Sequence, residues 1–232
     1  MILVTGATGL FGKHLMPLLK DAIGIGSKEL DITNEDAVKN YFYANKFDLV
    51  VHLAAYTDVA KAEKEIDKCI EVNVRGTYNL AKYAKRLLYI STEYVFDGEQ
   101  GNYKESDLPS PVNIYSKSKF FGEQVTRAYE HKVIRLGLKP RPYEHQKVPG
   151  DMYTSGDYVD VIAIELALAI EHYDELPEIL NIGTGRKRLI DLARQTRDDV
   201  VEISRDDIPT KLPKDTSLDL TKWEKLKNEF TK

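Results

Sequence analysis

Residues 1–12 read Met-Ile-Leu-Val-Thr-Gly-Ala-Thr-Gly-Leu-Phe-Gly, a short apolar run followed by three glycines spaced three apart. The apolar run predicts a buried strand, and the amphipathic stretch over about residues 10–20 predicts a helix. Gly6 would permit the tight turn between them, Gly9 would let the backbone approach a pyrophosphate, and Gly12 would let the helix pack closely on the strand. The pattern favours dinucleotide binding, with the phosphates near the first N–H groups of the helix. The alternative is a plain glycine turn.

Strand and helix patterns then alternate along the chain. Further apolar runs of strand length occupy residues 22–26, 48–53, 86–90, 132–136 and 179–182. Repeated alternation of this kind predicts an α/β fold of the Rossmann type, with a doubly wound parallel sheet. We expect residues 1–136 to form the dinucleotide-binding domain. Residues 137–232 should add a small C-terminal lobe, interleaved with a helix and strands that return to the sheet over about residues 158–204.

Composition and charge limit the classes of protein that the chain can belong to. It has 232 residues, of which 42% are hydrophobic and 30% are charged, and a net charge of −4. These values are ordinary for a globular protein, and the net charge argues against nucleic-acid binding. No apolar run approaches membrane-spanning length. A strand that starts at Met1 leaves no room for a signal peptide, and a single cysteine, Cys69, suits a reducing compartment, so we expect a cytoplasmic protein. The five histidines show no metal-ligand spacing, so we expect no metal site.

Tyr115 and Lys119 lie four residues apart in the run Tyr-Ser-Lys-Ser-Lys, at the start of a predicted helix. Residues at this spacing share one face of a helix. A nearby ammonium group can lower the pKa of a phenol from about 10 by roughly 1–3, which would let Tyr115 exchange a proton near neutral pH. Taken alone, the pattern also fits an ordinary solvated helix turn.

Two further stretches lie where strands end. Ala54 and Ala55 follow the strand at 48–53, and small residues there leave space for a ligand, although they also permit tight strand–helix packing. The second strand ends in Gly26-Ser27-Lys28, where a fold that prefers NAD usually carries an acid. A hydroxyl and a cation suit a 2′-phosphate better, so we expect NADP(H) to be favoured over NAD(H). The alternative is that Lys28 is a solvated loop residue.

Together, the motifs resemble those of the extended short-chain dehydrogenases/reductases. Within these, the chain is most similar to the dTDP-4-dehydrorhamnose reductase group, the sugar-nucleotide-binding reductases. The resemblance covers residue 1 to about residue 200 and rests on the helix that carries Asn73 and on the segments TGATGLFG, LDIT, HLAAYT, STEYVFDG, YSKSK and NIGTG.

The resemblance implies an oxidoreductase that transfers hydride from NAD(P)H to C4 of a 4-keto nucleotide sugar. Thr92 would bond the substrate carbonyl and Tyr115 would donate the proton. Lys119 would lower the pKa of Tyr115 and hold the nicotinamide ribose, and Asn73 would act as a structural and proton-relay residue. A homodimer is implied as well, formed through the helices that carry Asn73 and Tyr115.

The resemblance also assigns binding residues. Those expected to contact the cofactor are Gly6, Thr8, Gly9, Leu10, Phe11, Gly12, Ser27, Lys28, Asp31, Ile32, Ala54, Ala55, Tyr56, Tyr115 and Lys119. Those expected to contact the substrate are Thr92, Glu93, Tyr94, Arg135, Lys139 and Arg141.

The chain departs from the family pattern in its C-terminal part. It is short, so the substrate lobe is pruned to residues 137–157 plus the tail, and the usual arginine before Asp157 is missing. Binding of the nucleotide diphosphate would then fall to lysines and arginines that could equally be ordinary surface charges, namely Arg135, Lys139, Arg141 and Lys147.

Two other functions fit the same motifs. One is a non-catalytic, NADP-binding regulatory protein that resembles the regulatory subunit of methionine adenosyltransferase. The other is a nucleotide-sugar epimerase. A dehydratase is disfavoured, because dehydratases of this family carry Asp-Glu after the threonine and this chain has Glu93-Tyr94.

Overall fold

A six-stranded parallel sheet forms the centre of the computed structural model, which describes residues 1–232. The strands follow the order β10-β5-β4-β3-β1-β2, and every neighbouring pair is parallel. This is a Rossmann-type fold, as the alternating pattern predicts. The strand bounds are β1 Ile2–Thr5, β2 Ala22–Ile25, β3 Leu49–His52, β4 Leu87–Thr92, β5 Lys132–Leu136 and β10 Ile179–Asn181.

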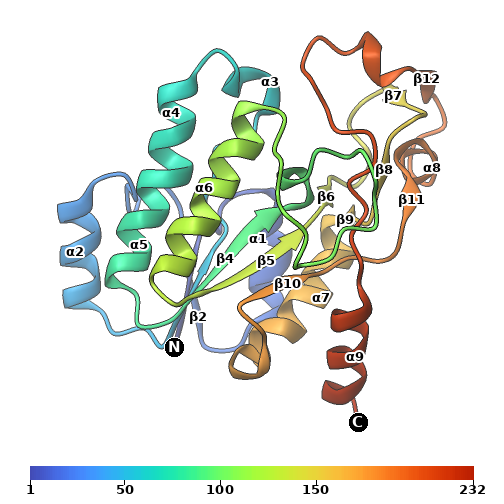
Figure 1. Cartoon of the computed structure of the whole chain (residues 1–232). Helices are drawn as coiled ribbons and strands as arrows, with labels where there is room; N and C mark the ends of the chain where they lie inside the picture. Colours follow the sequence, from blue (N-terminus) through green and yellow to red (C-terminus); the bar gives the residue numbers. More distant parts are fainter.

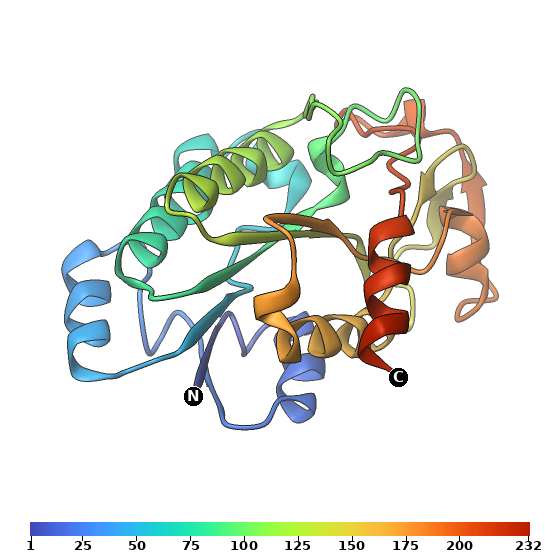
Figure 2. The same ribbon diagram turned by 60° about the horizontal axis from the view of Figure 1, so that its bottom comes forward.

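Helices cover both faces of this sheet, as Figures 1 and 2 show. One face carries α2 (Glu35–Ala44), α4 (Ile66–Ile70), α5 (Thr77–Tyr83) and α6 (Ile114–Ala128), and the other carries α1 (Leu10–Leu15) and α7 (Val159–Glu171). The C-terminal helix α9 (Thr221–Phe230) packs beside α7. The remaining short helices are α3 (Val59–Ala62), α8 (Leu189–Arg194), η1 (Met16–Leu18), η3 (Glu93–Val95), η4 (Tyr173–Glu175) and η5 (Arg205–Asp207).

The two helical layers exist because successive strand side chains point to opposite faces. Leu3 and Val50 belong to the core under α2 and α5, whereas their neighbours Val4 and Val51 belong to the core against α1 and α7. All four side chains are at most 1% exposed. Strands with apolar residues on both faces are typical of a parallel sheet covered on both sides.

The helix that carries Asn73 is not a regular α-helix throughout. A π-helical segment, η2 (Glu71–Gly76), lies between α4 and α5 and contains Asn73. Such segments are rare and frequently occur at functional sites. The apolar pattern of the sequence predicts the helix but does not show this local change of winding.

The C-terminal lobe is built from short strand pairs beside the carboxyl edge of the sheet (Figure 1). Residues 137–156 include three short strands. β6 (Leu138–Lys139) pairs with β9 (Asp157–Tyr158), β7 (Lys147–Pro149) with β12 (Val201–Ile203), and β8 (Tyr153–Thr154) with β11 (Lys187–Arg188). The lobe has a small core of its own, which includes Tyr143, Val148 and Leu192. None of the helices in the fold combines the length and the apolar character needed to cross a bilayer.

Candidate active site

A cavity of about 1380 Å³ opens where the strands of the main sheet end. Its walls come from the glycine loop after β1, from the ends of β2, β3 and β4, from the start of α6, and from lobe segments 136–149 and 207–212. In open α/β sheets ligands bind at this edge. Most of the residues expected to bind a cofactor line it, namely Gly6, Thr8, Gly9, Leu10, Phe11, Gly12, Ser27, Asp31, Ile32, Ala54, Ala55, Tyr115 and Lys119.

The glycine loop has the geometry that its spacing predicts. Gly6 has a φ of +71°, and a Cβ atom there would lie 2.6 Å from the backbone nitrogen of Ala54. A Cβ atom at Gly12 would lie 2.5 Å from Ala7 Cα, so helix and strand pack as closely as expected. At Gly9 the nearest atom to such a Cβ would be the Gly6 carbonyl oxygen at 3.2 Å. The loop therefore presents bare backbone to the cavity.

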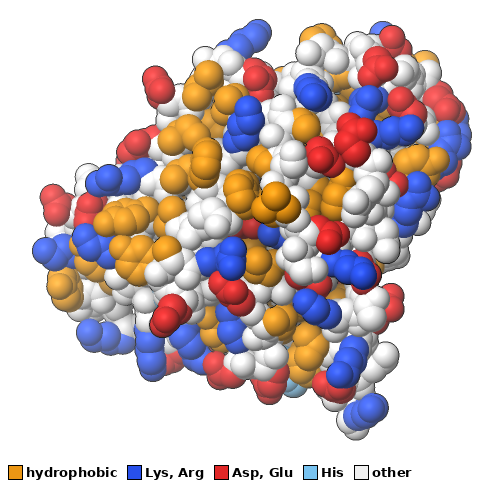
Figure 3. All heavy atoms as spheres, in the orientation of Figure 1, with side chains coloured by type: hydrophobic (Ala, Val, Ile, Leu, Met, Phe, Trp, Pro, Cys, Tyr) orange, Lys and Arg blue, Asp and Glu red, His pale blue; other side chains and the backbone are white.

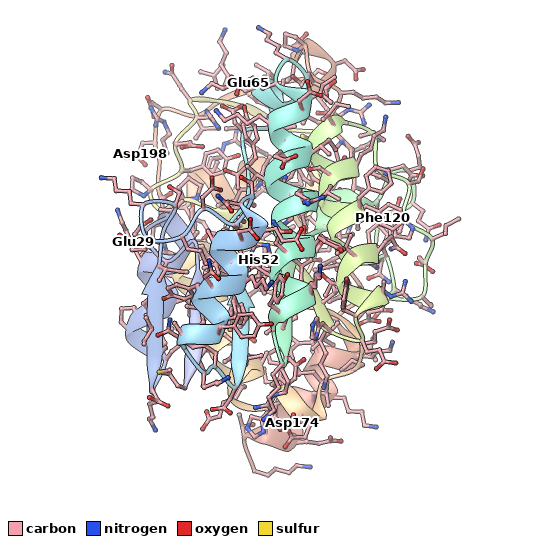
Figure 4. All side chains as sticks on the ribbon, turned by 90° about the vertical axis from the view of Figure 1, so that its left-hand side faces the viewer. Glu29, His52, Glu65, Phe120, Asp174 and Asp198 are labelled. Atoms are coloured by element: carbon pink, nitrogen blue, oxygen red, sulfur yellow. The ribbon has the colours of Figure 1, made fainter.

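The end of β2 differs from expectation at one residue. Ser27 lines the cavity, but Lys28 is exposed and does not. The carboxylate of Glu29, which the sequence reasoning missed, accepts a hydrogen bond of 2.8 Å from the Gly26 N–H. Figure 4 labels Glu29 at the edge of the molecule, and it too lies outside the cavity lining.

Tyr115 and Thr92 meet at the centre of the cavity wall, from α6 and β4 respectively. The Thr92 hydroxyl accepts a hydrogen bond of 3.2 Å from the Tyr94 N–H. Burial raises the pKa of Tyr115 above its ordinary value of 10, and the nearby Thr92 hydroxyl opposes the rise. The phenol is therefore protonated at neutral pH.

Lys119 lies on the same helix face as Tyr115, but its ammonium group is engaged elsewhere. Its Nζ donates a hydrogen bond of 2.7 Å to the Ile90 carbonyl and lies 4.2 Å from the centre of the Tyr89 ring. Burial lowers the pKa of Lys119 to about 7. In this structure the desolvation of the phenol dominates and raises the pKa of Tyr115, so the predicted effect of Lys119 on that pKa stays a prediction.

Asn73 and Tyr56 lie behind the wall rather than in it. The Asn73 side chain accepts a hydrogen bond of 2.7 Å from the Tyr56 N–H and donates to the Tyr56 carbonyl at 3.0 Å. It also donates to the Ser118 hydroxyl at 2.8 Å. Neither residue lines the cavity. In this arrangement Asn73 ties the segment after β3 to helix α6.

Two of the residues expected to bind substrate are engaged elsewhere. The guanidinium of Arg135 forms an ion pair with Glu123 at 2.8 Å, with both side chains at most 2% exposed. Arg141 pairs with Asp160 at 3.1 Å and stacks over Tyr158. Neither arginine lines the cavity. The structure therefore does not bring them to the cavity, because each already has an acidic partner on another element, and their assignment to the substrate stays a prediction.

The other expected substrate residues do line the cavity: Thr92, Glu93, Tyr94 and Lys139. Glu93 is 1% exposed and accepts hydrogen bonds from the Thr154 hydroxyl at 2.5 Å and the Ser155 N–H at 3.3 Å. Burial raises its pKa, and the positive charge of Lys139 opposes the rise. The Lys139 ammonium group therefore lies close enough to the Glu93 carboxyl group to affect its pKa.

Other lining residues were not expected from the sequence. Ser91 lines the cavity, and its hydroxyl is buried without a hydrogen-bond partner. The position of Ser91 directly before Thr92, at the end of a strand, could have indicated from the sequence that it lines the cavity. The lobe adds Tyr143, His145, Lys147 and Ile208, among others. In the sequence, Lys147 stands only as one of several cations that could bind the diphosphate. No local motif marks the other lobe residues as part of a cavity wall.

These features together form a cavity with a bare glycine loop at one end and a protonated phenol beside a threonine hydroxyl at its centre. Two hydroxyl groups near one point can bond an oxygen that becomes negatively charged, and the phenol can give it a proton. This arrangement is suited to reducing a carbonyl group.

Comparison with known proteins gives consistent matches. Residues 1–138 match the profile of the RmlD substrate binding domain. A dTDP-4-dehydrorhamnose reductase of Aggregatibacter actinomycetemcomitans is 41% identical over 145 residues, which cover 58% of this chain and 49% of the relative. Methionine adenosyltransferase 2 subunit beta of Danio rerio is 38% identical over 136 residues, 53% of this chain and 42% of that protein. The chain thus matches about half the length of these relatives.

A solved structure matches over most of the chain. It is dTDP-4-dehydrorhamnose reductase from Bacillus anthracis in complex with NADP. The two structures superpose with a TM-score of 0.83 at 27% identity, over 94% of this chain and 89% of the other. The similarity extends through the lobe, beyond the part that the family profile covers.

Proposed function

Because the chain belongs to the RmlD substrate binding domain family, we propose that it is an NADPH-dependent reductase of a 4-keto nucleotide sugar. The observation that carries this proposal is the shared cavity: Thr92, Tyr115 and Lys119 line the same space as the glycine loop. The names of the relatives and the NADP in the Bacillus anthracis structure support it.

In the proposed reaction the bound dihydronicotinamide supplies the hydride. Thr92 and Tyr115 bond the carbonyl oxygen of the substrate and stabilise the negative charge that develops on it. Tyr115 then gives that oxygen its proton, and its raised pKa ensures that the proton is present at neutral pH. Lys119 would hold the cofactor ribose, and Asn73 would keep α6 in place through Ser118.

The glycine loop supports a dinucleotide at the other end of the cavity. Its bare backbone at Gly9 leaves room for phosphates, and Asp31, Ile32, Ala54 and Ala55 continue the wall. We assign NADPH as the preferred cofactor because the Ser27 side chain lines the cavity at the end of β2, whereas the Glu29 carboxylate is bonded to the Gly26 N–H and lies outside the lining. Lys28 would then reach the 2′-phosphate from the exposed rim. Isothermal titration with NADPH and NADH tests this, since equal affinities would refute it and Lys28→Asp should erase the preference.

Lys139 and Lys147 are the cations proposed to bind the diphosphate of the nucleotide sugar. Both line the lobe side of the cavity, and neither forms an ion pair. Arg135 and Arg141 are excluded from this role by their acidic partners. The proposed substrate therefore lies with its sugar at Tyr115 and its nucleotide toward the lobe.

A homodimer is proposed through the helical face that carries α4, α5 and α6. Hydrophobic side chains gather on this face in Figure 3. Among them Ile66 is 45% exposed, Phe121 50% and Tyr129 37%. Light scattering at micromolar concentration should give twice the chain mass, and a monomer would reject the dimer.

A second candidate is a regulatory protein without turnover. The 38% identity to methionine adenosyltransferase 2 subunit beta favours it. Both candidates predict a dinucleotide on the glycine loop, so cofactor binding does not separate them. Turnover does, because only the reductase should oxidise NADPH.

The experiment is a screen of NADPH oxidation against a panel of 4-keto nucleotide sugars that vary in base and sugar. The reductase should consume NADPH with at least one of them. If the protein binds NADPH but reduces none, the regulatory candidate takes its place.

A further inference from the structure

A continuous set of buried hydrogen bonds runs beneath the cavity floor, and none of the roles above accounts for it. His52, the last residue of β3, is at its centre; it is fully buried, and Figure 4 labels it near the middle of the molecule. Its Nδ1 lies 2.8 Å from the Thr5 hydroxyl, and its Nε2 lies 3.1 Å from the Thr77 hydroxyl. We call Thr5, His52, Thr77 and the main chain of Asn73 the His52 chain.

The donor and the acceptor of each hydrogen bond in the His52 chain follow from the bond that the Thr77 hydroxyl donates. The Thr77 hydroxyl lies 2.7 Å from the Asn73 carbonyl, and since a carbonyl can only accept, the single hydroxyl proton is used there. Thr77 must therefore accept from a protonated Nε2 of His52. The neutral ring then has a bare Nδ1, which accepts from the Thr5 hydroxyl, and Thr5 is left to accept from the Ala54 N–H at 3.4 Å.

His52 must be neutral for this arrangement to hold. Its ring lies 5.5 Å from the Tyr89 ring, and the Lys119 ammonium lies 4.2 Å from that same ring on the cavity side. A charged imidazole would place two cations against one buried tyrosine. Burial and the charge of Lys119 lower the pKa of His52 to about 3, so the ring carries a single proton at neutral pH.

The two ends of the His52 chain reach the two functional parts of the cavity. At one end, Ala54 packs against the turn at Gly6. At the other, the Asn73 side chain donates to the Ser118 hydroxyl, which donates to the Tyr115 carbonyl at 2.7 Å. Every donor along this path has an acceptor, and satisfied buried networks of this kind fix the relative position of the elements they join.

We propose that His52 is a positioning residue, which holds the π-helical segment at Asn73 in register with the glycine loop and thereby sets where Tyr115 lies relative to the cofactor. It touches neither the cavity nor any ligand and acts only through Thr5 and Thr77. The effect on turnover rests on the proposed reductase function, but the effect on Tyr115 does not.

The test removes one link and compares it with a matched control. Thr77→Val deletes the hydroxyl that joins His52 to the Asn73 carbonyl. Thr126→Val is the control, because Thr126 is also fully buried and donates to a carbonyl four residues back, that of Gly122, at 2.8 Å. Thr77→Ser keeps the hydroxyl and should restore function.

We expect Thr77→Val to lower kcat about tenfold more than Thr126→Val, since small misplacements of a reacting group carry large rate penalties. The substrate KM should change little, and Thr77→Ser should behave like the unmodified protein. Equal kcat values for the two valine variants, at similar melting temperatures, would overturn the proposal.

A spectroscopic readout decides the proposal even if the protein has no turnover. In nitrogen-15 spectra His52 should carry its proton on Nε2. The backbone amide signal of Tyr115 should shift more in Thr77→Val than in Thr126→Val, although Thr126 shares its helix. A proton on Nδ1, or a larger Tyr115 shift in Thr126→Val, would overturn the proposal whatever the panel of keto sugars shows.

Discussion

The cofactor side and the lobe side of the cavity are built in different ways. On the cofactor side, consecutive residues of local motifs form the wall, with Gly6 packed at 2.6 Å against the backbone of Ala54. On the lobe side, segments 143–147 and 207–212 come together near the pairing of β7 with β12, from strands more than fifty residues apart. The first wall is determined by backbone geometry, whereas the second depends on distant contacts.

This difference teaches which assignments a sequence can support. Of the residues expected on the cofactor side, all but Lys28 and Tyr56 line the cavity. Among the cations expected on the lobe side, Lys139 and Lys147 line it but Arg135 and Arg141 do not. A backbone motif carries its own geometry, whereas the role of a charged side chain depends on which partner the fold brings to it.

The largest expected effect tests the centre of the cavity, where the two sides meet. Tyr115→Phe removes the proposed proton donor but keeps the ring that fills the wall. We expect kcat to fall by a factor of about 10²–10⁴, the usual contribution of a positioned acid, with NADPH affinity nearly unchanged. Steady-state kinetics and fluorescence titration check this, and unchanged turnover would remove Tyr115 from the mechanism. Lys119→Met should weaken both turnover and cofactor affinity.

The next largest effect is on stability. Substituting Arg135 tests whether this residue is part of the protein core. Arg135→Met leaves the Glu123 carboxylate buried without a partner, which should destabilise the fold by about 3–5 kcal/mol. Replacing both residues, with Glu123→Leu, should recover most of that loss. Chemical denaturation measures these changes. If Arg135→Met instead raised the substrate KM at unchanged stability, Arg135 would be assigned to substrate binding.

Lys139 tests the lobe side directly, with Arg141 as the matched control. Lys139→Ala should raise the KM for the nucleotide sugar about tenfold or more, as expected for the loss of a bond to a charged phosphate. Arg141→Ala should change it little, because that arginine forms an exposed pair with Asp160. Equal effects of the two changes would contradict the assignment of cations on the lobe side.

The smallest effect is a pH dependence that comes from Glu93. Burial raises its pKa above the ordinary value of 4.5, so the folded protein keeps this proton to higher pH than the unfolded chain does. Stability should therefore fall as pH rises from 4.5 through the raised pKa of the folded state. Glu93→Gln should flatten this part of the stability curve, as measured by melting temperature against pH. An identical curve in the variant would show that Glu93 is not held protonated.

The sequence predicts the fold and the family because the patterns that indicate them are local. The parallel sheet and the glycine turn follow from periodicity and spacing, and the family match over residues 1–138 confirms the resemblance. Three features of the structure could not be predicted from local sequence patterns. The π-helical segment contains Asn73, whose side chain bonds to the main chain of Tyr56, the carboxylate of Glu29 folds back on Gly26, and the phenol pKa depends on burial.

In the proposed reaction the two sides of the cavity meet at a carbonyl carbon, which receives hydride while Tyr115 protonates its oxygen. The most direct measurement uses NADPH that carries deuterium at the transferred position of nicotinamide C4, with mass and NMR analysis of the reduced sugar. We predict one deuterium per product, bonded to the sugar C4, and a rate that collapses in Tyr115→Phe. Oxidation of NADPH with no deuterium in the sugar, or deuterium at another carbon, would contradict the account.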